Sequence, residues 1–136
     1  MAEIPPNDPD PAPPSATILV VDDEEVMRTF LSSFLTRKGY RVSSATSGEN
    51  ALEVWEQMTL KPQLLITDLI MPGMSGTDLA IVLKRFQPKL KVLYITGYGF
   101  ELSEAAQTAI RDTPHVFLPF VPDYLLSTVK AALSQT

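Results

Sequence analysis

Short, wholly apolar runs alternate along this chain with segments whose apolar residues recur at helical spacing. The first run is Ile18–Val21, and the helical pattern after it continues until Gly39. The expected strands are 18–21, 41–45, 64–67, 92–95 and 116–118, and the expected helices are about 26–35, 51–58, 79–86, 101–110 and 123–133. Strands and helices that alternate in this way predict an α/β fold, with a parallel sheet covered by helices on both faces.

The first 15 residues differ in composition from the rest of the chain. Six of the twelve prolines lie within residues 1–14, among polar and acidic residues that offer little apolar surface to bury. We therefore expect residues 1–15 to form a disordered, Pro-rich linker. Residues 16–136 should form one domain, because a chain of 136 residues suffices for one sizeable core and not for two.

Several protein classes conflict with the composition. The longest apolar runs are far shorter than the roughly 18 residues that cross a bilayer, and the start of the chain lacks the features of a secretory signal. The absence of cysteine excludes disulfides and thiolate metal sites. A net charge of −5 without a Lys/Arg cluster argues against direct nucleic-acid binding. We expect a cytoplasmic protein without membrane insertion.

Carboxylates and one hydroxyl directly follow three of the predicted strands. Asp22 and Asp23 follow the first strand, Asp68 the third and Thr96 the fourth. Ligands of open parallel sheets bind outside the carboxyl ends of the strands, so these side chains should converge. Gathered carboxylates repel one another unless a cation lies among them. Because all the donors are hard oxygens, the set favours Mg²⁺, with Mn²⁺ as a substitute.

An aspartate nucleophile beside a phosphate-bridging metal ion is the arrangement that forms an aspartyl phosphate. Asp68 is the better nucleophile candidate, because Asp22 and Asp23 are adjacent and can share the metal ion from one strand end. Two structural explanations compete with this one. An acidic pair before a helix often only caps it, and an Asp before Leu69 to Gly73 could be an ordinary turn residue.

Four segments follow one another in an order that is typical of one family: Ile18–Glu24, Asp68–Gly76, Ile95–Tyr98 and Pro119–Phe120. Together they resemble the response-regulator receiver domain, and the resemblance covers about residues 16 to 134. It implies the flavodoxin-like, doubly wound (βα)5 fold of bacterial chemotaxis response regulators. In that fold the five parallel strands have the order 2-1-3-4-5.

The resemblance also implies roles for individual residues. Asp68 would accept a phosphoryl group from a histidine kinase or a histidine phosphotransfer protein, and Thr96 would bind a phosphoryl oxygen and move the following loop. Asp22, Asp23, Asp68 and the backbone carbonyl of Ile70 would hold Mg²⁺. A downstream protein would bind the face formed by the fourth helix, fifth strand and fifth helix. Such a module is not an enzyme beyond the gain and loss of its own phosphoryl group.

The chain departs from the family at two positions near the fifth strand. The family has a lysine directly before the Pro-Phe pair, where this chain has Leu118 before Pro119 and Phe120. The family also has an aromatic residue three positions earlier that reports phosphorylation, where this chain has its single histidine, His115. We interpret His115 as a partly exposed residue at the start of a strand rather than as a metal ligand.

The missing lysine changes the charge balance around a phosphorylated Asp68. Two carboxylates, Mg²⁺ and a dianionic phosphoryl group sum to about −2, and a lysine would bring the sum to about −1. One such contact at ~4 Å and an effective dielectric of ~20 is worth roughly 4 kcal/mol before desolvation. We therefore expect phosphorylation to persist but to be less stabilised, or less well coupled to output.

Three other functions compete with that of a phosphoacceptor. A receiver-like interaction module that needs no phosphate is favoured by Leu118 and His115 and opposed by the complete aspartate set. A phosphatase of the haloacid-dehalogenase type would need an Asp-x-Asp pair after the first strand. A flavodoxin-like nucleotide binder would need a phosphate-cradling loop there. A stand-alone regulator and a receiver from a hybrid sensor kinase are both compatible with the sequence.

Overall fold

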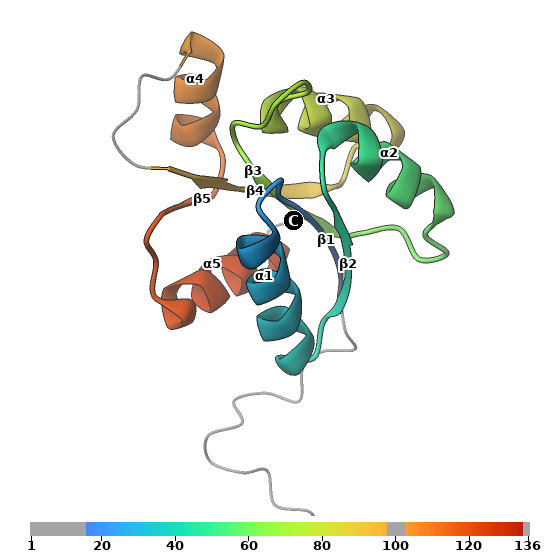
Figure 1. The fold of residues 1–136 in the computed structure, drawn as a ribbon, viewed down its shortest axis with the longest axis vertical. Helices are drawn as coiled ribbons and strands as arrows, with labels where there is room; N and C mark the ends of the chain where they lie inside the picture. Colours follow the sequence, from blue (N-terminus) through green and yellow to red (C-terminus); the bar gives the residue numbers. More distant parts are fainter. Residues whose placement is uncertain (1–15, 98–102, 135–136) are drawn as a thin grey trace, which may run out of the picture.

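The computed structural model describes residues 16–97 and 103–134. Within them, five parallel strands form one sheet in the order β2-β1-β3-β4-β5, as the sequence predicted (Figure 1). The strands are β1 (Thr17–Val21), β2 (Arg41–Ala45), β3 (Leu64–Asp68), β4 (Lys91–Thr96) and β5 (His115–Phe117). β5 begins one residue before the predicted strand and ends one residue before Leu118. The linker predicted over residues 1–15 lies outside the described residues.

A helix follows each strand. The helices are α1 (Glu25–Arg37), α2 (Gly48–Gln57), α3 (Gly76–Phe86), α4 (Glu104–Asp112) and α5 (Pro122–Ser134). Ser47 is the N-cap of α2, and its hydroxyl accepts the Asn50 N–H at 3.0 Å. The start predicted for the fourth helix, near Glu101, lies outside the described residues, and α4 begins after an N-cap at Ser103.

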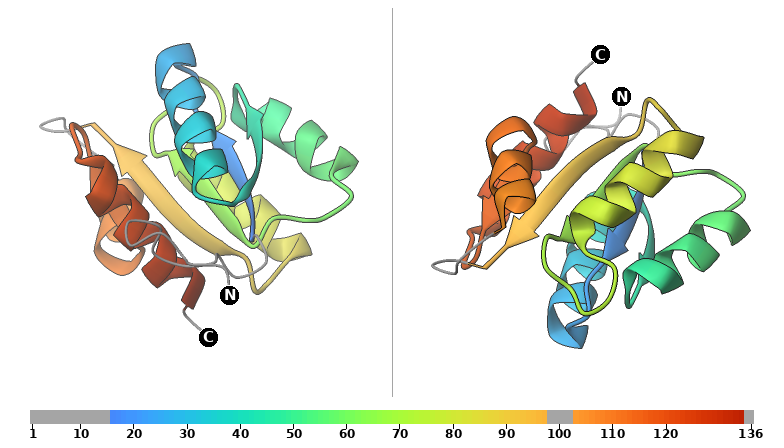
Figure 2. Two further views of the ribbon diagram at one scale, coloured as in Figure 1. Left: turned by 90° about the horizontal axis from the view of Figure 1, so that it is seen from below. Right: turned by 90° about the horizontal axis from the view of Figure 1, so that it is seen from above.

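Two hydrophobic layers cover the sheet. On one face, buried residues of β1, β3 and β4 pack against α1 and α5, with Leu35 and Leu125 at the centre. On the other face, α2, α3 and α4 pack against alternate residues of the same strands, with Leu65 and Leu83 among them. Figure 2 shows α5 on one side of the sheet and α3 on the other. The apolar runs predicted as strands are buried because helices cover both sheet faces.

Parallel pairing brings the carboxyl ends of the strands to one edge of the sheet. Asp68 is the last residue of β3 and pairs with Ile95 of β4, and Thr96 pairs with Phe117 of β5. Val21, the last residue of β1, pairs with Thr67. Side chains that follow β1, β3, β4 and β5 therefore lie near one another at this edge. Among the described helices, none has both the length and the apolarity needed to span a membrane.

Candidate functional site

The loop between β1 and α1 carries the acidic pair Asp22 and Asp23. Asp22 is 2% exposed, whereas Asp23 is exposed. The Asp22 N–H donates to the Ala45 carbonyl at 3.2 Å, and the Asp22 carboxylate accepts the Glu24 N–H at 2.8 Å. The guanidinium of Arg28 donates to the Asp22 carbonyl oxygen at 2.9 Å. The capping interpretation of this pair is therefore wrong, because the N-cap of α1 is Glu24, whose side chain makes no capping hydrogen bond, and the bond of the Asp22 carboxylate lies within the loop.

Asp68 ends β3 and is half-buried. Its carboxylate accepts the Ile70 N–H at 3.2 Å, which turns the chain away from the strand. The chain then returns so closely that a Cβ on Gly76 would lie 2.2 Å from the Asp68 carbonyl oxygen. Gly76 is thus required by a close backbone approach, and its N–H donates to the Leu69 carbonyl at 2.9 Å.

The carboxylates of Asp22, Asp23 and Asp68 form an acidic cluster. One carboxylate oxygen from each residue lies within 4.8 Å of the others. Desolvation, with a smaller contribution from the charges of Asp22, Asp23 and Glu24, raises the pKa of Asp68 to about 7 despite the opposing hydrogen bond from the Ile70 N–H. Burial is also the main cause that raises the pKa of Asp22, while the hydrogen bond from the Glu24 N–H and, to a smaller extent, the charge of Arg28 lower it. The cluster therefore concentrates negative charge that a cation would relieve.

The donor set fits a magnesium ion. Its atoms are hard carboxylate oxygens, they converge within one ion's reach, and one of the carboxylates is buried. Each neighbouring charge that shifts the pKa of Asp68 is negative. The side chain of Ile70 is exposed, and the metal-ligand role of its backbone carbonyl stays a prediction.

Thr96 lies at the end of β4, between the acidic cluster and β5. It is buried, and its hydroxyl donates to the Gly97 carbonyl at 3.2 Å. The Thr96 carbonyl accepts the Leu118 N–H at 3.0 Å. Its position agrees with the sequence analysis, while its bond to a phosphoryl oxygen stays a prediction. Tyr98, part of the same segment, lies outside the described residues.

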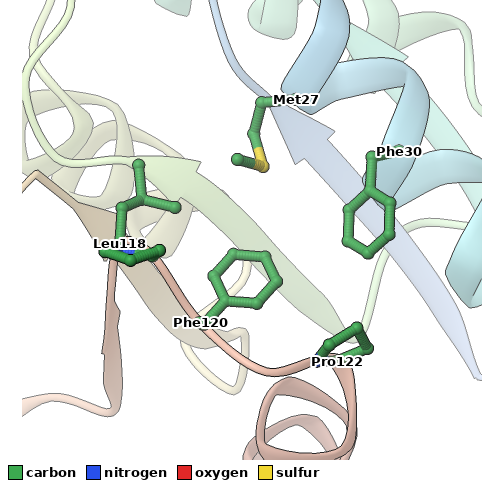
Figure 3. A pocket seen from close by; sticks show the side chains of 6 residues that line it. Met27, Phe30, Leu118, Phe120 and Pro122 are labelled. Atoms are coloured by element: carbon green, nitrogen blue, oxygen red, sulfur yellow. The ribbon is translucent and has the colours of Figure 1, made fainter.

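Leu118 lines an apolar hollow instead of presenting a cation. Figure 3 shows Met27 and Phe30 of α1 facing Leu118, Phe120 and Pro122. The hollow that these residues line has a volume of about 660 Å³. The Phe30 and Phe120 rings lie 6.0 Å apart between centroids. The residue at the family's lysine position thus forms part of an apolar wall. This apolar hollow was missed in the sequence, because Met27 and Phe30 sit on a helix far from Leu118 along the chain.

His115 opens β5 and is partly buried, as the sequence predicted. Its Nδ1 lies 3.0 Å from the Thr113 carbonyl, and its ring meets the edge of the Phe117 ring at 5.1 Å. The acidic cluster does not include it. Its role as a switch position stays a prediction.

The family model of the response regulator receiver domain matches residues 18–129. The chain belongs to this family. Receiver domains are signalling domains of two-component systems rather than classical enzymes, and they generally bind Mg²⁺ in an acidic pocket. An acidic cluster is present in this chain, at the carboxyl ends of β1 and β3. The predicted family and its flavodoxin-like fold are therefore confirmed.

The proteins that this chain resembles include both short and long ones. The chain is 33% identical over 123 residues to the sensor kinase CckA of Brucella abortus, covering 89% of this chain and 13% of that protein. It is 30% identical over 115 residues to the chemotaxis protein CheY of Thermotoga maritima, covering 82% of this chain and 92% of that protein. A receiver protein from Sinorhizobium medicae superposes with a TM-score of 0.75 at 27% identity, covering 88% and 94% of the two chains.

The length of the relatives bears on the function of the whole protein. The chain spans 13% of the sensor kinase and about half of the regulators RR06 of Streptococcus pneumoniae (52%) and PhoP of Bacillus subtilis (49%). The family thus occurs both as a separate protein and as one part of longer proteins.

Arg28 is a residue of the site that the sequence analysis missed. It lies on α1, six positions after Asp22, and its contact is with a main-chain oxygen. An arginine in the first turns of a helix is common, and no spacing rule marks it. Only the path of the loop shows that its guanidinium reaches back to the strand end.

Proposed function

We propose that this chain is a phosphoacceptor module that takes a phosphoryl group onto Asp68 from a phosphohistidine. The donor would be a histidine kinase or a histidine phosphotransfer protein. The acidic cluster carries the proposal, since one carboxylate oxygen from each of its three residues lies within 4.8 Å of the others at the sheet edge. Asp22, Asp23, Asp68 and the carbonyl of Ile70 would hold Mg²⁺, or Mn²⁺ in its place.

The reaction is a displacement at phosphorus. A carboxylate oxygen of Asp68 forms the new O–P bond while the N–P bond to the donor imidazole breaks, and the electron pair stays on that nitrogen, which then takes a proton. Attack needs the ionised carboxylate, yet burial and three acidic neighbours raise the pKa of Asp68 to about 7. The bound metal ion would neutralise charge and orient the phosphoryl oxygens. Asp22 and Asp23 supply the oxygens that keep the ion beside Asp68.

The output side of the module follows from the same sheet edge. Thr96 would hydrogen-bond a phosphoryl oxygen and move the loop that follows it. This movement would be transmitted to His115 and to the face formed by α4, β5 and α5. Phe117 and Tyr124, in β5 and α5, are large apolar residues that are exposed there. We infer a downstream protein partner for this face, with weaker coupling because Leu118 replaces the lysine.

We further propose that residues 16–136 form the receiver domain and residues 1–15 a Pro-rich linker in a cytoplasmic protein. The similarity to a sensor kinase supports an origin in a hybrid kinase. The similarity to a full-length chemotaxis protein supports a stand-alone regulator. Both arrangements use the same phosphoacceptor.

Intact-protein mass after incubation with Mg²⁺ and acetyl phosphate tests the proposal. The native chain should gain one phosphoryl group, and the Asp68→Asn variant should gain none. Asp78→Asn is a matched control, because Asp78 is exposed in the first turn of α3 and outside the cluster. An unmodified native chain, under conditions that phosphorylate a control receiver and again with a phosphohistidine donor, would contradict the proposal.

A second candidate is a receiver-like interaction module that works without phosphorylation. It is favoured by the side chain of Leu118, which lines the apolar hollow and brings no positive charge to the site. The two candidates differ in one measurement. If a partner binds the native chain and Asp68→Asn equally, with and without acetyl phosphate, the phosphate-independent module is correct.

A further inference from the structure

Three hydrogen bonds hold Asp22 and the loop that it begins. One joins the Asp22 N–H to β2, one joins the Asp22 carboxylate to the Glu24 N–H, and one joins the Asp22 carbonyl to Arg28. The first bond joins the loop to the main chain of β2, and the second lies within the loop itself. The bond from Arg28 alone among the three links the loop to the side chain of a helix.

The contact of Arg28 is directed at the backbone rather than at a carboxylate. Its Nη1 donates to the Asp22 carbonyl oxygen at 2.9 Å, in a partly buried position. The guanidinium is therefore a fixed support for the peptide that joins Asp22 to Asp23. Because α1 packs on the sheet through Leu31 and Leu35, that support is anchored in the core.

We propose that Arg28 is a positioning residue for the metal ligands of this receiver. By holding the Asp22–Asp23 peptide, it keeps both carboxylates turned toward Asp68. This proposal rests on the proposed function, since it concerns the binding of Mg²⁺ at the acidic cluster. It assigns Arg28 no contact with the ion or with a phosphoryl group.

Charge and position predict opposite effects when Arg28 is removed. A cation near a divalent ion repels it, so electrostatics alone predicts tighter Mg²⁺ binding without Arg28. Support of the loop predicts weaker binding, because residues that orient metal ligands typically contribute about 10-fold to 100-fold in affinity. The direction of the change therefore separates the two roles.

The experiment measures the affinity of the full chain for Mg²⁺ by NMR titration of its backbone amides. Arg28→Met removes both the donor and the charge, Arg28→Gln keeps a donor without the charge, and Arg28→Lys keeps the charge and a donor. Arg37→Met is the matched control, because Arg37 is exposed in the last turn of the same helix. Thermal unfolding of each variant without Mg²⁺ verifies that it is folded at the titration temperature.

We expect Arg28→Met to weaken Mg²⁺ binding roughly tenfold, Arg28→Lys to restore most of the affinity and Arg37→Met to bind as the native chain does. Unchanged or tighter binding by Arg28→Met would overturn the proposal. Equal losses of Mg²⁺ affinity in Arg28→Met, Arg28→Gln and Arg28→Lys would also overturn it, because a retained hydrogen-bond donor would then not contribute to the affinity. A native chain that does not bind Mg²⁺ would instead contradict the proposed function.

Discussion

The two sides of the sheet edge differ in chemistry although one strand separates them. On one side, Asp22, Asp23 and Asp68 form the acidic cluster that a metal ion would complete. On the other side, Leu118 turns the lysine position of the family into the wall of an apolar hollow. β4 lies between β3 and β5, so the two sides are roughly 10 Å apart. The aspartates that would hold the metal ion and accept the phosphoryl group are present. The lysine that would contact the phosphoryl group from the other side is replaced by Leu118.

From this difference we infer that the two functions proposed for the site, phosphoryl acceptance and coupling to β5, are physically separable. Charge neutralisation around Asp68 needs oxygen ligands and a metal ion, whereas coupling to β5 needs a group that reaches the phosphoryl from that strand. A chain can lose the second while it retains the first. The following predictions test that separation, beginning with the largest expected effect.

The acidic cluster should make the metal-free protein less stable as the pH rises. The pKa of Asp68 is raised from 3.8 to about 7, so its contribution is fully present below about pH 4 and is lost as the pH rises through 7. Screening in this half-buried site reduces the loss to roughly 2 kcal/mol. Chemical unfolding without Mg²⁺ between pH 4 and pH 8 should show this loss in the native chain and a much smaller one in Asp68→Asn. If the free energy of unfolding changed with pH in the same way in both proteins, ionisation of Asp68 would not be what destabilises the native chain.

Magnesium should reverse that destabilisation at high pH. At tenfold excess over its dissociation constant, Mg²⁺ should stabilise the native chain by about 1.4 kcal/mol at pH 8, because only the folded cluster binds it. The gain should be much smaller at pH 5, where protons compete for Asp68, and small in Asp22→Asn. Thermal unfolding with and without Mg²⁺ measures the difference, and Asp78→Asn should respond as the native chain does. A gain of equal size in Asp22→Asn would place the ion elsewhere.

A lysine at position 118 should change the apolar side of the sheet edge and leave the acidic cluster as it is. Leu118→Lys should lengthen the lifetime of phosphorylated Asp68 roughly fivefold, about 1 kcal/mol, because part of the Coulomb gain is lost to desolvation. Intact-protein mass at intervals after removal of acetyl phosphate gives the lifetime. Leu118→Met keeps the apolar wall and serves as the control. Equal lifetimes of the Lys and Met variants would mean that position 118 does not reach the phosphoryl group.

His115 should have the smallest effect of the four. His115→Phe keeps an aromatic ring beside Phe117, so stability should change by less than about 0.5 kcal/mol. Its affinity for Mg²⁺ should equal that of the native chain, since His115 lies outside the acidic cluster. NMR titration of the variant with Mg²⁺ measures both the affinity and the amides that respond. A changed affinity would show that β5 and the cluster are coupled without the lysine.

Most of the fold was predictable because it depends on local patterns. The apolar run Leu64–Thr67 predicts β3 and the Ser47 N-cap predicts the start of α2, since strand burial and helix capping need only neighbouring residues. The convergence of Asp22, Asp23 and Asp68 was also predictable, because parallel strands bring their carboxyl ends to one edge. The boundaries of β5 differ by one residue, since a short edge strand is paired on one side only.

The sequence by itself determined the alternation of strands and helices, the family, the position of the aspartates and the absence of the lysine. The tertiary structure decided how deeply Asp68 is buried, and therefore how far its pKa rises. It also decided that Arg28 reaches the Asp22 carbonyl and that Leu118 faces Met27 and Phe30 of α1. The last two depend on where α1 packs against the strand ends. Such packing is set by the whole core, and no spacing within one segment encodes it.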